Sequence, residues 1–204
     1  MMKHLTLILA VLCCGLLVSF TGIKPHTDTY KVNTDSSKLE WYAEKVSGKH
    51  NGTIKLASGE FSNNHGSYTG TFVVDMNSIQ NTDIQSAESK AKLEGHLKSP
   101  DFFDVAAFPK AKFVMTSITP LAEAKDGLTH AVKGMLTIKD KTNEITFNSA
   151  MRMEGSMVFA TGSAVVDRAK FDVKYASKAF FEDIGDKMIY DEFTLKFSIV
   201  AAKL

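Results

Sequence analysis

The sequence predicts an all-β domain, an antiparallel barrel or sandwich of about eight or nine strands with one main helix. Apolar and polar residues alternate with a period of two along most of the chain, as expected for strands with one buried face. Only one segment carries helical spacing, and no regular succession of strand and helix indicates a parallel sheet. The 204 residues, 44% of them hydrophobic, are enough to build a single core.

The first 21 residues are predicted to be a signal peptide that is removed on export. Lys3 and His4 provide a basic start, residues 5–18 are almost entirely apolar, and residues 19–21 lie where a signal peptidase cleaves. The apolar run is shorter than the roughly 20 residues that a membrane-spanning helix needs. Residues 22–204 are therefore expected to form one domain, periplasmic or secreted, with no membrane span.

Both cysteines, Cys13 and Cys14, lie inside this apolar run. Leu12 precedes Cys13, whereas a lipoprotein signal needs small residues there. The mature domain is therefore expected to contain no lipid anchor, disulfide, thiol nucleophile or cysteine-bound zinc. Without Lys3 it carries 23 basic and 23 acidic residues, and this neutrality argues against nucleic acid as a partner.

The first strands are expected between residues 29 and 76. Leu39, Trp41 and Ala43 alternate with polar residues and share one face of a strand. Residues 47–52 predict a hairpin turn, because the dipeptide Asn51-Gly52 readily adopts the positive φ angles that tight turns need. These predicted strands cover residues 29–45, 54–62 and 68–76.

The periodicity changes at Thr82. Thr82 and Gln85 have the spacing of a capping box, and Glu88 and Lys92 form a favourable charge pair one turn apart. These features predict a helix of about three turns that ends near Gly95. Its small, alanine-bearing face suits close packing against a sheet or across the mouth of a barrel.

Strand alternation resumes at Lys110 and is clearest near the C-terminus, over residues 192–199. The inward faces predicted from it are rich in phenylalanine and methionine. A barrel of about eight strands has an interior that is either filled by side chains or able to hold one small ligand, and methionine suits adaptable apolar sites. Both interpretations remain open. The candidate cavity-lining residues are Phe72, Met76, Phe113, Met115, Leu136, Phe147, Met151, Phe159, Phe193 and Phe197, and Met153 and Met157 follow the same pattern.

Candidate catalytic residues are few. His96 is the only histidine near clustered carboxylates, those of Asp101 and Asp104, and it could act in acid–base chemistry or simply anchor the end of the helix. The sequence contains no HExxH metal motif, no GxSxG nucleophile turn and no glycine-rich phosphate loop. We therefore expect no enzymatic activity, no metal and no cofactor.

The segment from Gly95 to Phe113, GHLKSPDFFDVAAFPKAKF, combines an HL pair, a DFFD corner and a phenylalanine before proline. With TFVVDMNSIQNTD from Thr71, VKGMLTIKDKTNEITF from Val132, and the later DRAKFDVKYAS and IYDEFTLKFSIVA, this pattern spans almost the whole mature chain. It resembles the YceI-like lipid or polyisoprenoid-binding family. Relative to the usual family pattern, Asp172 replaces a common glycine and VSGKHNGTIKL replaces a more basic turn.

The resemblance implies a lipocalin-like, extended antiparallel β-barrel of about eight strands with one main helix, whose apolar pore holds an isoprenoid chain. The expected partner is a small amphiphilic lipid, such as an isoprenoid quinone or polyprenyl lipid, carried or sequestered without covalent chemistry. An enzyme acting on such a lipid, and a stress-related interaction module with a filled barrel, are the alternatives; a dimer is compatible with all three. The rim of the barrel, or a structural motif, would contain His96, Asp101, Phe102, Phe103 and Asp104.

Overall fold

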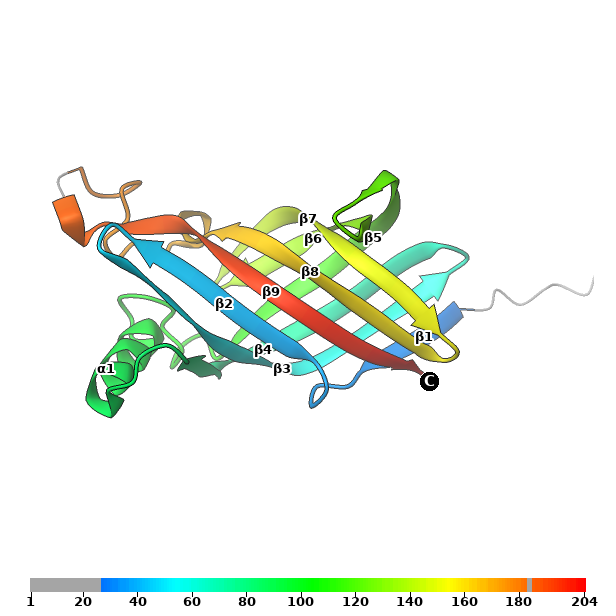
Figure 1. Ribbon diagram of the computed structural model, residues 1–204, viewed down its shortest axis with the longest axis horizontal. Helices are drawn as coiled ribbons and strands as arrows, with labels where there is room; N and C mark the ends of the chain where they lie inside the picture. Colours follow the sequence, from blue (N-terminus) through cyan, green and yellow to red (C-terminus); the bar gives the residue numbers. More distant parts are fainter. Residues whose placement is uncertain (1–26, 183–184) are drawn as a thin grey trace, which may run out of the picture.

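The computed structural model describes residues 27–182 and 185–204, which form a long β-barrel with one α-helix at one end (Figure 1). The predicted signal peptide and its cleavage site lie outside the described residues. None of the described helices is both long and apolar enough to cross a membrane. The strands are β1 (Thr27–Val32), β2 (Lys38–Lys45), β3 (Gly48–Asn64), β4 (Ser67–Asn81), β5 (Lys110–Lys125), β6 (Leu128–Ile138), β7 (Lys141–Glu154), β8 (Met157–Asp167) and β9 (Ile189–Lys203); the helices are α1 (Ala87–Lys98), η1 (Arg168–Phe171) and η2 (Gly185–Lys187).

The nine strands form one antiparallel sheet in the order β1-β3-β2-β9-β8-β7-β6-β5-β4. The sheet closes because β4 also pairs with β3. The short strand β1 pairs with both β3 and β9 at the end opposite α1. The all-β prediction is therefore confirmed, and the pairing of β3 with β4 selects the barrel over the sandwich.

Two irregularities decide which side chains face the interior. Alternate residues of a regular strand share a face, so residues an odd number of positions apart point in opposite directions. A register shift after Leu56 in β3 nevertheless allows both Leu56 and Phe61 to face inward. A second shift after Met115 in β5 has the same effect on Met115 and Ile118.

The hairpin turn predicted at Asn51 and Gly52 is wrong. Both residues lie within β3, and the turn between β2 and β3 occupies residues 46–47. Gly52 serves close packing instead, because a Cβ atom there would collide with the Trp41 indole and the Gln80 carbonyl. The Trp41 Nε1 group donates a hydrogen bond to that same carbonyl over 3.1 Å.

The helix α1 is confirmed, with different ends from those predicted. Its N-cap is Ser86, whose hydroxyl accepts a hydrogen bond from the Ser89 backbone N–H over 3.3 Å. Thr82 lies before the helix and donates its backbone N–H to a carbonyl of β3. The helix continues beyond Gly95 to Lys98, with Ser99 as its C-cap, so the predicted capping box and C-terminus are both wrong.

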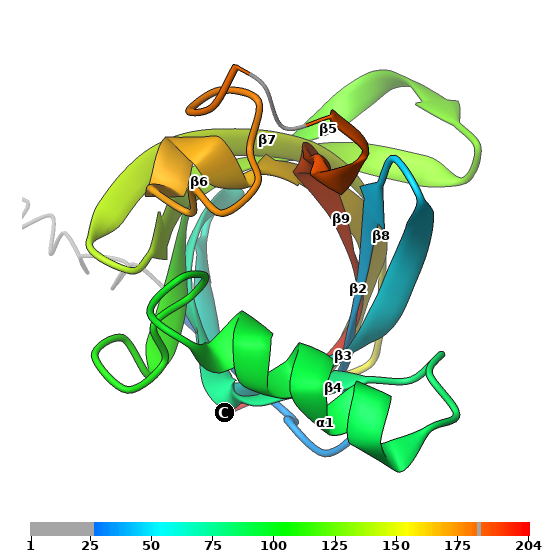
Figure 2. The ribbon, with the colours of Figure 1, turned by 90° about the vertical axis from the view of Figure 1, so that its left-hand side faces the viewer.

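One end of the barrel is covered by α1 and the segment that follows it (Figure 2). Leu97 from α1 and Phe102, Phe103 and Val105 from the next turns are buried in the core. The rings of Phe102 and Phe103 meet edge to face at 5.0 Å. The helices η1 and η2 and the residues beside them lie at the same end of the barrel, on the side opposite α1. Two parts of the chain therefore cover this end.

Candidate ligand-binding cavity

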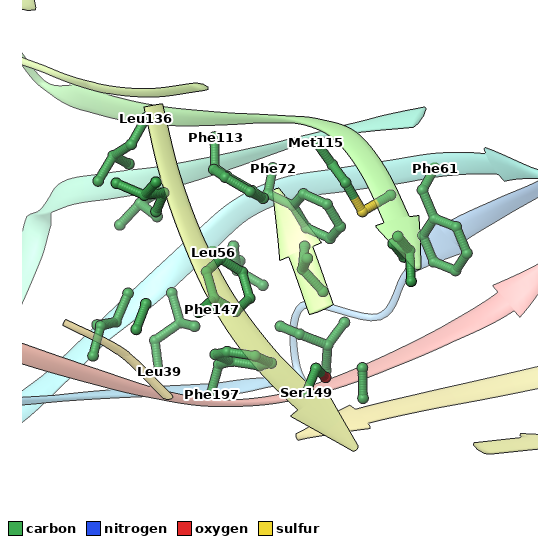
Figure 3. A pocket seen from close by; sticks show the side chains of 18 of the residues that line it. Leu39, Leu56, Phe61, Phe72, Phe113, Met115, Leu136, Phe147, Ser149 and Phe197 are labelled. Atoms are coloured by element: carbon green, nitrogen blue, oxygen red, sulfur yellow. The ribbon is translucent and has the colours of Figure 1, made fainter. Parts of the chain in front are cut away.

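The barrel interior contains an apolar cavity of about 150 Å³. Every strand except β1 contributes to its lining, because each of these strands presents alternate apolar side chains to the interior (Figure 3). The lining residues are Leu39, Leu56, Phe61, Phe72, Val74, Phe113, Met115, Ile118, Val132, Leu136, Ile145, Phe147, Ser149, Met151, Val158, Ala160, Ala164, Val166, Leu195, Phe197 and Ile199.

Ser149 is the only polar residue among the described residues that line this cavity. It is almost fully buried, and its hydroxyl donates to the Thr161 carbonyl over 3.0 Å, with the Ala150 carbonyl 3.2 Å away. The hydroxyl proton is thus already used by the barrel wall. The cavity therefore offers a ligand apolar contact and dispersion forces, with almost no polar recognition.

Four phenylalanine rings form a continuous row across the cavity. The centroid of Phe113 lies 6.3 Å from that of Phe72 and 5.6 Å from that of Phe147. The ring of Phe147 meets that of Phe197 at 5.4 Å, close to perpendicular. We call these four residues the phenylalanine row. They come from β4, β5, β7 and β9, so the row connects strands from around the barrel.

Seven of the ten predicted lining residues line the cavity: Phe72, Phe113, Met115, Leu136, Phe147, Met151 and Phe197. Met76 and Phe193 lie on the inward-facing registers of β4 and β9 but not at the cavity. Met76 is buried in the core, and Phe193 packs against it. Whether any of these side chains contacts a ligand stays a prediction.

The assignment of Phe159 to the interior is wrong. Its neighbours Val158 and Ala160 line the cavity, so the Phe159 ring lies on the outer face of β8. There it stacks under the guanidinium of Arg152, 4.3 Å from the ring centroid. Met157 shares this outward register. Met153, near the end of β7, is 54% exposed and does not line the cavity.

The other 14 of the 21 lining residues were not among those predicted. Val132, Ile145 and Leu195 belong to the same alternating patterns as the predicted phenylalanines and could have been included on that signal. Leu56 and Ile118 could not, because each is separated from its inward neighbour by a register shift that the sequence does not show. Small residues such as Ala160 give no size signal at all.

The five residues predicted at the rim separate into two groups. Phe102 and Phe103 are buried core residues at the covered end of the barrel. Within the described part of the chain no hydrogen bond or ion pair joins His96 to Asp101 or Asp104, so the structure does not assemble the candidate acid–base group. The His96 ring packs instead against Phe102 at 5.8 Å and against Tyr175 of the opposite segment at 4.4 Å.

Arg168, which the sequence analysis did not single out, holds the second covering segment in place. Its side chain is 2% exposed, and Nη1 donates to the carbonyls of Val173 and Tyr175 over 2.8 and 2.9 Å. Nη2 donates to the Ile189 carbonyl over 3.0 Å and lies 3.2 Å from the Asp191 carboxylate. Burial lowers the pKa of Arg168, and the carboxylate of Asp191 acts in the opposite direction.

Among the described residues, no group of histidine, cysteine, aspartate or glutamate side chains is placed to hold a metal ion. The described geometry is that of an antiparallel barrel around an apolar cavity, which defines the class of β-barrels with an internal cavity. A family model described as the YceI-like domain matches residues 30–201. The chain belongs to this family, as the sequence resemblance predicted.

Curated relatives match over part of their length. A UPF0312 protein from Pseudomonas putida (strain W619) is 31% identical over 100 residues, which are 48% of this chain and 50% of that protein. A UPF0312 protein from Pseudomonas fluorescens is 38% identical over 66 residues, 32% of this chain and 33% of that protein. The chain thus matches half or less of the length of these relatives.

Solved structures share the fold at low sequence identity. BcnA from Burkholderia cenocepacia superposes with a TM-score of 0.65 at 20% identity, covering 84% of this chain and 99% of that one. A polyisoprenoid binding domain from Saccharophagus degradans gives a TM-score of 0.60 at 15% identity, covering 86% and 98%. At these identities the similarity supports the barrel architecture alone.

Proposed function

We propose that this protein binds a lipid with an apolar, isoprenoid-type chain in the barrel cavity and carries or sequesters it. The observation that carries the proposal is the lining itself, in which a closed barrel presents aliphatic, aromatic and methionine side chains to an internal space. Burial of a hydrocarbon chain in such a space contributes about 25 cal/mol per Å² of apolar surface removed from water. The same space would disfavour a charged or strongly hydrated group.

Family membership supports the same class of ligand. The neighbour from Saccharophagus degradans is described as a polyisoprenoid binding domain, and this chain shares its barrel architecture. An isoprenoid chain is slender, because its branches are single methyl groups, and it is apolar enough to need no polar partner in the interior. An isoprenoid quinone and a polyprenyl lipid are the two candidates.

The proposed role requires no covalent chemistry. A carrier needs an apolar compartment and a route for the ligand, and the rings of the phenylalanine row supply adaptable apolar surface. If the predicted signal peptide is removed on export, this role would be carried out in the periplasm or the secreted fraction. We expect no cofactor beyond the bound lipid.

Ligand identification tests the proposal. Protein purified from its native source is examined by native mass spectrometry and, after organic extraction, by lipid analysis. A co-purifying lipid with a long apolar chain is the expected result. Its occupancy should fall in Leu136→Trp, which fills the cavity, and stay unchanged in Val165→Trp, whose side chain faces solvent on β8.

A barrel that is recovered empty and also refuses added farnesol would contradict the proposal. That result would favour the interaction module with a filled barrel. The cavity volume of about 150 Å³ is comparable to that of an apolar cavity that accommodates benzene, which is smaller than farnesol. A longer ligand must therefore extend beyond the cavity.

A further inference from the structure

The barrel wall opens between β4 and β5. These strands pair from Asp75 and Lys110 as far as Gly70 and Met115, and there the pairing ends. The β3–β4 hairpin and the β5–β6 hairpin then continue separately, and Figure 1 shows them diverging at the end of the barrel away from α1. We call the space where they part the β4–β5 seam.

The seam contains a pocket of about 480 Å³ next to the internal cavity. Phe61 and Met115 line both spaces, so these two side chains form the boundary between them. Figure 3 shows both at the same end of the cavity lining. Methionine is unbranched and flexible, which suits a boundary that must let a chain pass.

The polar character of the seam differs from that of the cavity. Ser62, Thr69, Thr71 and Thr116 contribute hydroxyl groups, and Glu60 is the only charged residue among the described residues that line it. The Thr116 hydroxyl donates to the Lys133 carbonyl over 3.1 Å and the Ser62 hydroxyl lies 3.4 Å from that of Thr29, so Thr69 and Thr71 are the main candidates to bind a head group. Hydroxyls both donate and accept, and a carboxylate accepts from a hydroxyl or an ammonium group. A phosphate group is normally bound by arginine, lysine or helix N-termini, and the lining of the seam contains no arginine or lysine.

The apolar cavity suits the hydrocarbon chain of an amphiphile, and the more polar seam suits its head group. The cavity has one hydroxyl, which is already bonded to the barrel wall, so a polar head group inside it would lose its hydration without compensation. The seam offers free space and hydroxyl groups beside the cavity. An apolar chain in the cavity would therefore leave its head group at the seam.

We propose that the β4–β5 seam is the head-group site and lateral portal of the barrel, and that it takes an uncharged, hydrogen-bonding head group such as a hydroxyl or carbonyl. The inference rests on the proposed lipid-binding function. Ligands that carry a phosphate are disfavoured because Glu60 is the only charged residue of the described seam lining; Lys31, its cross-strand partner on β1, lies outside that lining.

An added peptide strand is the rival occupant, because the separated strands expose backbone groups at their edges. Two features of β5 oppose this. The register shift after Met115, in the ladder with β6, bends β5, and Pro120 has no backbone N–H to donate. The edge is thus unsuited to a long, regular strand, whereas a compact head group needs no ladder.

The first experiment compares head groups on one chain. Farnesol, farnesylamine and farnesyl phosphate are added to the full-length mature protein, and binding is measured by displacement of a fluorescent fatty-alcohol probe. We expect farnesol to bind about fivefold or more tightly than farnesyl phosphate. Glu60→Lys should reduce or reverse this preference for farnesol over farnesyl phosphate. Glu40→Lys, the same charge change at an exposed position on β2, should leave the preference unchanged.

The second experiment obstructs the seam. Thr116→Trp places a large ring at its edge and should slow farnesol uptake about fivefold or more, measured by stopped-flow fluorescence. Thr146→Trp is the matched control, because Thr146 is also an exposed threonine, on β7 and outside the seam. Thermal melting of each variant establishes that it is folded.

The outcomes separate the two proposals. Failure of the wild-type barrel to bind any of the three farnesyl probes contradicts lipid binding itself. Tight farnesol binding that neither Glu60→Lys nor Thr116→Trp alters, in folded variants, overturns the seam while lipid binding stands. Binding of an extended peptide that Thr116→Trp blocks, with farnesol uptake unchanged, would assign the seam to the rival occupant.

Discussion

Phenylalanine rings in the cavity are positioned by glycines on neighbouring strands. Gly162 lies opposite Phe197 in the β8–β9 ladder, and a Cβ atom there would come within 2.7 Å of the Phe197 ring. Gly134 lies opposite Met115 in the β5–β6 ladder, and a Cβ atom there would come within 2.5 Å of the neighbouring Phe113 ring. The absence of a side chain thus lets the ring lie flat against the wall, and this leaves the cavity open.

Adding a methyl group at this position should therefore reduce the space for a ligand. Gly162→Ala would push the Phe197 ring into the cavity, and we expect it to destabilise the protein by about 1–3 kcal/mol and to weaken farnesol binding. Urea unfolding and probe displacement measure the two effects. Gly48→Ala is the control, because a Cβ atom at Gly48 meets nothing within 4 Å; equal effects at both positions would contradict this explanation.

Truncation within the phenylalanine row should have the opposite effect on ligand size. Phe147 contacts Phe113 on one side and Phe197 on the other. Phe147→Ala would therefore enlarge the cavity between these two rings. We expect a loss of about 3 kcal/mol in the free energy of unfolding, at the low end for phenylalanine because the ring already borders a cavity.

Binding should show the enlargement directly. In a series of geraniol, farnesol and geranylgeraniol, Phe147→Ala should favour the longer alcohols relative to the wild-type protein. An unchanged order of affinities, in a variant that is destabilised as expected, would show that the row does not limit the ligand.

At the scale of elements, the two segments that cover the barrel end depend on different chemistry. The α1 segment is held by buried aromatic rings, whereas residues 172–182 and 185–188 are held by Arg168 and the backbone carbonyls that it binds. A fully buried guanidinium is favourable only when its donors are satisfied. Arg168 meets this condition through carbonyls on both sides of the segment.

Replacement of this arginine tests that role. Arg168→Lys retains a charge but cannot reach the separate carbonyls of Val173, Tyr175 and Ile189 with one ammonium group. We expect a destabilisation of about 3–5 kcal/mol and faster proteolysis within residues 172–182. Lys170→Arg, at an exposed position on η1, is the control and should leave both measurements unchanged. A rate of proteolysis in Arg168→Lys equal to that of the wild-type protein would contradict the role of Arg168 in holding this segment.

Asp83 connects β3 to the turn that leads into α1. Its carboxylate accepts hydrogen bonds from the Asn51 backbone N–H and from Asn81, and it lies 2.9 Å from His50 Nδ1. Burial raises the pKa of Asp83, but these hydrogen bonds outweigh it and the pKa lies below its usual value. A carboxylate with a depressed pKa stabilises the fold above its unfolded pKa, and this stability is lost as the pH falls through its folded pKa.

The consequence is a defined pH dependence. Asp83→Asn should be less stable than the wild-type protein at pH 7, and the difference should shrink as the pH falls below the usual aspartate value of about 4. Urea unfolding across this range measures it. Asp126→Asn, in an exposed turn with positive φ that asparagine also tolerates, should show no such trend; a constant difference for Asp83→Asn would contradict the titration.

Strand positions could be predicted because the period of two is a property of the sequence. The predicted inward positions of Phe147, Met151 and Phe197 all line the cavity. Phe159 could not be placed in this way, because both faces of β8 contain apolar residues. The sequence therefore does not show which face points inward, and a shift of one residue in pairing would exchange the two faces. The seam was also hidden, since pairing between distant strands depends on their shared register and not on either sequence alone.

At the scale of the whole molecule, export remains a prediction of the N-terminal sequence. The mature protein is expected to begin near residue 22 and to contain no cysteine, because Cys13 and Cys14 precede that point. Mass spectrometry of the exported protein should show the loss of about 21 residues, and a thiol reagent should label nothing. A lipid-modified Cys13 or Cys14 at the mature N-terminus would contradict this prediction.

The closure of the ring has a kinetic consequence. β2 lies between β3 and β9, and β1 pairs with both β3 and β9, so the first strands of the described chain complete their ladders only with its last strand. Contacts this distant in sequence form slowly and depend on nearly the whole chain being present. A chain still lacking residues 189–203 has no barrel to close, so folding must follow synthesis of the C-terminal strand, and the apolar inner face stays exposed to aggregation and to chaperones until then.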